Sequence, residues 1–202
     1  LSLIGLLVLE QEARAGGHAL RGSQRIVAMI RRSSAAGGML IGLSVFQGEF
    51  DFGVPQFRLV EQPALIAAAA GITLVAARLW SGRGAALAAV TFFLVIRGAV
   101  SLIEYGFGEP VPRMPLYLGA AVIVEVVAVL LARRAIVAGA VAGFLVGTVG
   151  TASEHLWSQS VMVLPWGSDI ALEGYVGSAV VGTAAGIIGA LLALGLRGEL
   201  PA

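Results

Sequence analysis

The sequence predicts an all-α fold, a polytopic bundle of transmembrane helices with five clear spans and a truncated helix at the N-terminus. Three observations predict it. The 202 residues are 58% hydrophobic, with a mean hydropathy of +0.93. Only 12% are charged, whereas a soluble domain carries roughly 25%. Apolar runs of about 20 residues recur, the length that crosses a hydrocarbon core of about 30 Å. We therefore expect one integral membrane domain over residues 1–202.

The expected elements follow in order from the apolar runs and the residues that break them. Residues 1–9, which begin with Leu1 rather than Met, are too short to cross and resemble the tail of a truncated helix. Residues 10–32 form an arginine-rich loop, and the bundle occupies 33–196, beginning with a partial span at 33–46. The five clear spans are Pro63–Trp80, Ala85–Phe107, Pro115–Ala132, Ala135–Trp157 and Leu172–Leu196. Proline is tolerated at helix starts because the N–H it lacks is unused there.

The placement of arginine predicts the orientation of the bundle. All 13 basic residues are arginine, and after the first loop five of them mark every second connection between spans. The arginines of these later connections are Arg78, Arg83, Arg133, Arg134 and Arg197. The positive-inside rule places these connections, and the 10–32 loop, in the cytoplasm beneath the inner membrane. The mostly acidic loops at 47–62, 108–114 and 158–171 then face outward.

Small residues repeat at four-residue spacing on the last two spans. Gly139, Gly143 and Gly147 lie on one, and Gly182 and Gly186 on the other. Such spacing lets helix backbones approach closely in lipid, where no hydrophobic force drives helices together. We expect these glycines to tighten the bundle itself, and an interface with another subunit is the alternative.

Two opposite charges lie inside consecutive spans. Counted from their shared outer connection, Arg97 and Glu125 are each about ten residues deep, roughly 15 Å at 1.5 Å per residue. Burying either charge alone costs at least ~2.5 kcal/mol on insertion scales, so we expect the two to pair. The pair would fix the register of the helices, or alternatively serve a proton or ion relay.

Carboxylates and one imidazole gather at the expected outer membrane edge. Glu104 lies seven residues after Arg97 on the same helix face, and Glu173 opens the last span. The residues that could ligate a metal there are Glu49, Asp51, Glu154 and His155. Carboxylate and imidazole suit copper, zinc, iron or manganese. Plain solvated loop charges are the other interpretation of the same residues.

The composition excludes several classes of chemistry. His18 and His155 are the only histidines and lie on opposite sides of the expected topology, so one chain cannot ligate a haem through two histidines. Without lysine there is no Schiff base, and without cysteine there is no disulfide or thiolate site. The formal net charge of +1 gives no indication of nucleic-acid binding.

Short motifs between Ser44 and Leu196 resemble, in order, the A subunit of the copper-dependent membrane monooxygenases. This family includes the ammonia and particulate methane monooxygenases. The motifs are GEFDF (48–52), RLWSGRG (78–84), EYGFG (104–108), the helix from Pro115 to Glu125, and VLPWGSDIALEGY (163–175).

The resemblance implies that Glu49 and Asp51 correspond to the family's paired outer acids and Glu125 to the acid that ends a proline-initiated helix. Arg97 falls where the methane enzymes carry a glutamate, and residues 33–47 lack the family's upstream histidines. The resemblance also implies that copper is held mainly by partner subunits of the B and C types.

We therefore expect an integral membrane subunit of a multi-subunit, copper-dependent, monooxygenase-like oxidoreductase. Its expected partners are the lipid bilayer, other membrane subunits and a small-molecule substrate, and whether this chain itself is catalytic is left open. Two other functions fit the sequence. One is a small proton-coupled transporter, and the other is a scaffolding subunit of a different membrane complex.

Overall fold

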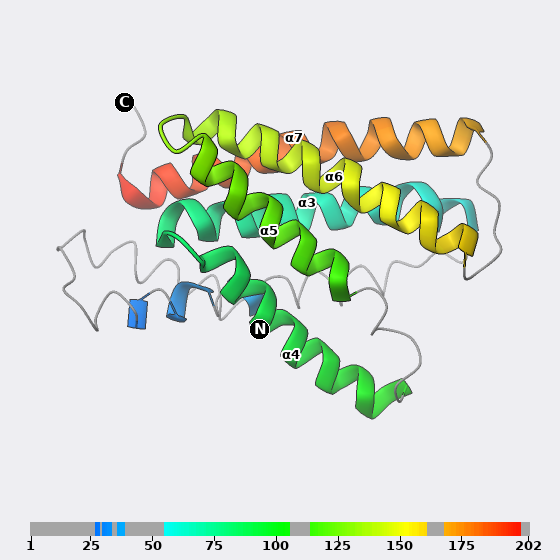
Figure 1. The fold of residues 1–202 in the computed structure, drawn as a ribbon, viewed down its shortest axis with the longest axis horizontal. Helices are drawn as coiled ribbons and strands as arrows, with labels where there is room; N and C mark the ends of the chain where they lie inside the picture. Colours follow the sequence, from blue (N-terminus) through cyan, green and yellow to red (C-terminus); the bar gives the residue numbers. More distant parts are fainter. Residues whose placement is uncertain are drawn as a thin grey trace.

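The computed structural model describes residues 27–28, 30–33, 36–38, 55–105, 114–160 and 168–198. Every regular element in these residues is a helix, which confirms the all-α class (Figure 1). The long helices are α3 (Pro55–Ser81), α4 (Ala85–Tyr105), α5 (Met114–Leu130), α6 (Ala135–Ser160) and α7 (Ser168–Arg197). Each corresponds to one of the five predicted apolar spans.

The helix bounds correct the prediction chiefly at the N-terminal ends of α3 and α7. Pro55, not Pro63, begins α3, in the first helical position that suits a residue without an N–H. Residues 55–62 are therefore helical and not part of an outer loop. Because α7 begins at Ser168, Glu173 does not open this helix but follows its first turn, where it is exposed. Residues 1–26, and most of the partial span at 33–46, lie outside the described residues.

α3 is the central helix of the bundle, because it packs against each of the other four. α6 and α7 run along it, whereas α4 packs on α5 and α3 and diverges from the rest (Figure 1). α7 is parallel to α3, since Gly71 approaches Ala185 and Leu79 contacts Arg197. α6 is antiparallel to α7. The direction of the chain thus alternates through the bundle.

Two helices contain stretches long and apolar enough to cross a membrane, Ala135–Ser153 and Leu172–Arg197. The other three contain shorter apolar stretches, Ala67–Ser81, Ala85–Ile96 and Tyr117–Leu130. By length and composition, α6 and α7 are therefore the two described helices that could cross a membrane.

The glycines of α6 and α7 face one another along a single seam. A Cβ at Gly143 would lie closer than 3.0 Å to the backbone of Gly182, and one at Gly139 would meet Gly186 in the same way. The third contact joins Gly147 to the backbone of Ser178. The prediction that these glycines tighten the bundle itself is confirmed.

Small side chains fill the interior while larger ones cover the outside. Of the buried apolar residues that the structure describes, most are alanine, and Phe93 and Leu74 are the bulkiest of the fully buried side chains. Bulky apolar residues are exposed along the outer faces, including Leu172, Val176 and Val180 at four-residue intervals on α7. A soluble helix instead turns its polar face to water.

Candidate functional site

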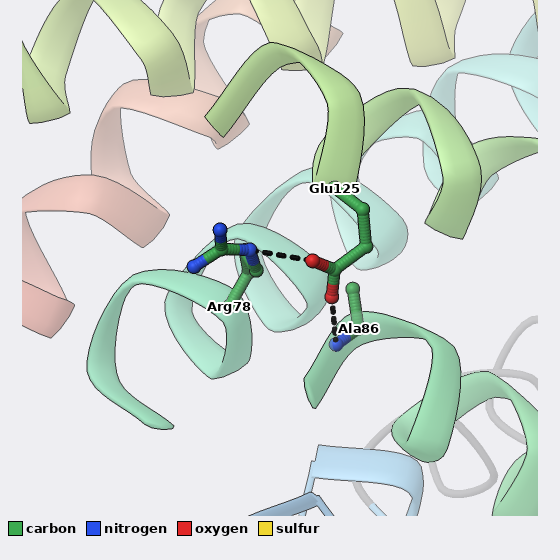
Figure 2. Close-up of polar contacts among 3 residues, drawn as sticks. All are labelled: Arg78, Ala86 and Glu125. Atoms are coloured by element: carbon green, nitrogen blue, oxygen red, sulfur yellow. Dashed lines mark hydrogen bonds and ion pairs between the residues drawn. The ribbon is translucent and has the colours of Figure 1, made fainter. Parts of the chain in front are cut away.

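The best-defined polar site lies where α3, α4 and α5 meet (Figure 2). Glu125 of α5 places Oε2 2.6 Å from Nε of Arg78, which lies in the last turn of α3. Its other oxygen, Oε1, accepts a hydrogen bond of 3.0 Å from the backbone N–H of Ala86. One carboxylate thus joins three helices.

The local sequence explains why α4 needs this acceptor. The turn between α3 and α4 is Gly82–Arg83–Gly84, and both glycines have positive φ, 99° and 84°. Gly82 N–H donates to Arg78 C=O, which ends α3, and Gly84 C=O accepts from Ala88, which starts α4. Serine, threonine, aspartate or asparagine would normally cap the first N–H groups. Because glycine occupies this position, Glu125 supplies the cap from another helix.

The electrostatics of this site are favourable on both sides of the carboxylate. A helix N-terminus attracts negative charge and a helix C-terminus attracts positive charge, and Glu125 and Arg78 occupy these respective positions. Their side chains are only 10% (Arg78) and 13% (Glu125) exposed. The Arg78 Nε contact is an ion pair without the alignment of a hydrogen bond, since its N–H makes none. Little water screens the pair, so the loss of either partner would leave a buried charge.

The predicted pairing of Arg97 with Glu125 is wrong, because the two residues lie at different levels along the packed helices α4 and α5. Two contacts fix how α4 and α5 align: Ala86 with Glu125, and the rings of Phe93 and Tyr117, whose centroids are 4.7 Å apart. On this alignment Arg97 lies eleven residues beyond Ala86, about 16 Å along the helix. The prediction counted residues from the connection between α4 and α5 and assumed that both helices begin level with it. Because α5 starts partway along α4, equal counts do not place residues at the same level.

A second contact holds the N-terminal segment against the same end of the bundle. The guanidinium carbon of Arg32 lies 4.2 Å from the ring centroid of Trp80, which is near the C-terminus of α3. Such cation–π contacts favour a cation over the indole face. Gly37 in the same segment approaches the carbonyl of Ala89 and the ring of Phe92 on α4. Arg32 thus packs on α3, and Gly37 packs on α4.

The structure describes only part of the predicted metal site. Glu49 and Asp51 lie outside the described residues, as do the side chains of Glu154, Glu104 and Arg97. His155 is described, on α6, and its Nδ1 lies 3.4 Å from the hydroxyl of Tyr175 on α7. No three potential metal ligands among histidine, aspartate and glutamate gather within the described part of the chain.

The comparisons with known proteins add no identification. No protein-family model, no curated protein and no solved structure gives a significant match to this chain.

Sequence reasoning missed the partners rather than the acid itself. Glu125 stands out as a charge in an apolar helix, yet Arg78 was assigned to a cytoplasmic connection by its position near the end of a span. The informative signal is the uncapped turn Gly82–Arg83–Gly84, which requires an acceptor from elsewhere. The arrangement holds the Glu125 carboxylate in place and so fixes α3, α4 and α5 relative to one another.

Proposed function

We propose that this chain is a multi-pass membrane protein in which all five long helices cross the bilayer. The distribution of side chains carries this part of the proposal. Bulky apolar residues cover the outer faces, small residues fill the interior, and the charged pair Arg78–Glu125 is turned inward. Lipid tails favour this distribution, since intramembrane charges face the bundle and pair with one another.

The proposed orientation places the arginine-bearing end in the cytoplasm. The turns at 82–84 and 131–134 and the C-terminus of α7 belong to this end, which Figure 1 shows away from the α6–α7 connection. The positive-inside rule then assigns the opposite end, with the acids of the outer loops, to the outer face of the inner membrane.

The topology can be tested with single cysteines, because the native chain has none. Ala132→Cys lies in the exposed turn between α5 and α6, and Ser160→Cys ends α6. We expect an impermeant thiol reagent added to intact cells to label Ser160→Cys, and Ala132→Cys only after lysis. Labelling of both sites from outside would exclude the topology.

We propose further that the bundle is a subunit of a multi-subunit, copper-dependent oxidoreductase of the membrane monooxygenase kind, acting on a small substrate. The order of the short motifs from GEFDF to VLPWGSDIALEGY supports this proposal. In it, Glu49, Asp51, Glu154 and His155 lie at the outer end, where copper would be bound chiefly by partner subunits. The Arg78–Glu125 site holds the helices together beneath it.

Purification in mild detergent, followed by mass spectrometry and metal analysis of one fraction, tests this second part. We expect copper in stoichiometric amount and two membrane partners, one of them rich in histidine. A metal-free chain without such partners would exclude a monooxygenase subunit and leave a transporter or a scaffold. Glu125→Gln then separates those two, because it would abolish proton-coupled transport but only weaken a scaffold.

A further inference from the structure

Four exposed arginines surround the end of the bundle that the Arg78–Glu125 site holds together. Arg83 lies in the turn between α3 and α4, Arg133 and Arg134 lie in the turn between α5 and α6, and Arg197 ends α7. We call these four residues the basic end. Because they come from three separate points of the chain, their gathering is a property of the fold.

Contacts between the helices hold the basic end together. Arg197 Nη1 donates a hydrogen bond of 3.3 Å to Leu79 C=O, which fixes the end of α7 beside the end of α3. Glu125 ties the start of α4 to α5 only a few residues before the α5–α6 turn. The three arginine-bearing points therefore lie within about two helical turns of one another along the bundle axis.

Among the described residues, Glu125 is the acid at the basic end, and it does not reach the exposed arginines of the two turns. Both of its oxygens are engaged, one with Arg78 and one with the Ala86 N–H. It is also largely buried, whereas Arg83, Arg133 and Arg134 are exposed. These three arginines therefore give the described part of the basic end a positive surface.

Exposed apolar side chains border the arginines directly. Leu130, three residues before Arg133, is 75% exposed, and Ile136, two residues after Arg134, is 45% exposed. Leu192 is likewise 48% exposed, five residues before Arg197 at the end of α7. A surface on which apolar side chains give way to arginine within about one and a half helical turns matches the boundary between acyl chains and headgroups.

We propose that the basic end binds the phosphate groups of anionic phospholipids in the leaflet it faces. This inference rests on the proposed membrane location and adds the partner of that end. Guanidinium is planar and presents paired donors that match phosphate oxygens, so arginine binds this group more specifically than a point charge does. Each basic residue at an anionic surface contributes binding that a zwitterionic headgroup does not provide.

Native mass spectrometry of the full chain in detergent micelles tests the proposal, with added phosphatidylglycerol or phosphatidylcholine as the probes. We expect phosphatidylglycerol to be retained preferentially. The double variant Arg133→Gln/Arg134→Gln should lose about tenfold in apparent affinity for it. Both residues are exposed in a turn, so the variant should keep its helix content, which circular dichroism verifies. Arg133→Lys/Arg134→Lys should retain most of the binding.

The control is Arg58→Gln, which removes one positive charge from the first turns of α3, at the opposite end of the bundle, and is compared with the single variant Arg133→Gln. An equal loss in this control, or equal retention of the two lipids by the native chain, would overturn the proposal. Displacement of phosphatidylglycerol by inorganic phosphate at constant ionic strength would also overturn it, because the surface would then take the free anion. The measurement needs neither copper nor a partner subunit. If phosphatidylglycerol is not bound preferentially, the proposed function still stands. If both cysteines are labelled from outside the cell, the proposed membrane topology is refuted whatever the lipid result.

Discussion

The α6–α7 seam and the α3–α4–α5 junction hold the same bundle together by opposite means. At the seam, backbone meets backbone, and Gly143 and Gly182 leave no space for a side chain. At the junction, the backbones stand further apart and the Glu125 carboxylate bridges them to Arg78 and Ala86. The seam depends on the lack of side chains at its glycines, and the junction depends on a few polar groups being present and paired.

This difference teaches where each interface is vulnerable. A seam of glycines gains dispersion and close helix contact but fails when any atom is added. A junction built on a buried carboxylate tolerates changes in size but fails when a polar partner is removed, because the remaining group is left unpaired in a poorly hydrated place.

Substitution of Gly143 by leucine should open the seam. A Cβ at Gly143 already lies closer than 3.0 Å to the backbone of Gly182, so a full side chain forces α6 and α7 apart. We expect a loss of at least about 4 kcal/mol in the free energy of unfolding. Equilibrium unfolding in mixed micelles, followed by far-UV circular dichroism, measures it.

Gly150→Leu is the matched control for this substitution. Gly150 lies on the same helix, but nothing is within 4 Å of a Cβ placed there. Its replacement should change stability by less than about 1 kcal/mol, and the higher helix propensity of leucine favours the folded state. If Gly143→Leu and Gly150→Leu were equally stable, the seam would not be the tight contact described above.

Removal of the Glu125 side chain should break the junction. Glu125→Ala leaves Arg78 buried without its counter-charge and the Ala86 N–H without its acceptor. We expect a cost of about 3 kcal/mol, close to that of breaking other buried pairs. The same unfolding titration measures it, and hydrogen exchange of the first amides of α4 should speed up.

Glu125→Gln separates the cap from the ion pair. The amide keeps an oxygen that can accept from Ala86 but carries no charge, so we expect a smaller cost of about 1–2 kcal/mol. In a double-mutant cycle with Arg78→Met, a coupling energy of about 1–3 kcal/mol is expected for residues in one network. Additive effects would show that Arg78 and Glu125 act independently.

The sequence allowed the helices to be predicted far better than their mutual positions. Apolar runs and breakers placed the starts of α4 and α6 correctly, and four-residue glycine spacing identified the seam, because both are local patterns. The partner of Glu125 could not be found by counting residues. Its register depends on where α5 begins beside α4, and that is set by packing, with Phe93 against Tyr117. The sequence pattern predicts one end of the bundle for the candidate metal ligands, and His155, the candidate whose side chain the structure describes, lies near the C-terminal end of α6. Whether the candidates meet in space cannot be predicted from the pattern.

Replacement of Arg32 should weaken the docking of the N-terminal segment on the junction. Arg32→Met keeps an apolar stem but removes the cation 4.2 Å from the centre of the Trp80 ring. We expect a loss of about 1 kcal/mol, since Trp80 is only 9% exposed and the contact is partly desolvated. Arg32→Lys, which keeps a cation, should lose less. Unfolding followed by tryptophan fluorescence measures both variants, and identical stabilities would argue against the cation–π contact.

The smallest effect is expected near the C-terminal end of α6, where α6 meets α7 through His155 and Tyr175. The Tyr175 hydroxyl lies 3.4 Å from His155 Nδ1, beyond the usual range of a strong hydrogen bond, so Tyr175→Phe should cost less than about 0.5 kcal/mol.

The proposed copper chemistry predicts a second, larger effect of the same substitution. A ligating histidine commonly uses its other ring nitrogen for a hydrogen bond that orients the ring, and loss of that partner typically lowers metal affinity by 10- to 100-fold. Competition with a chromogenic chelator, applied to the purified complex, measures the copper affinity, with His155→Gln as the reference variant. If neither variant changes copper binding while both remain folded, His155 is not a ligand and serves only to pack α6 against α7.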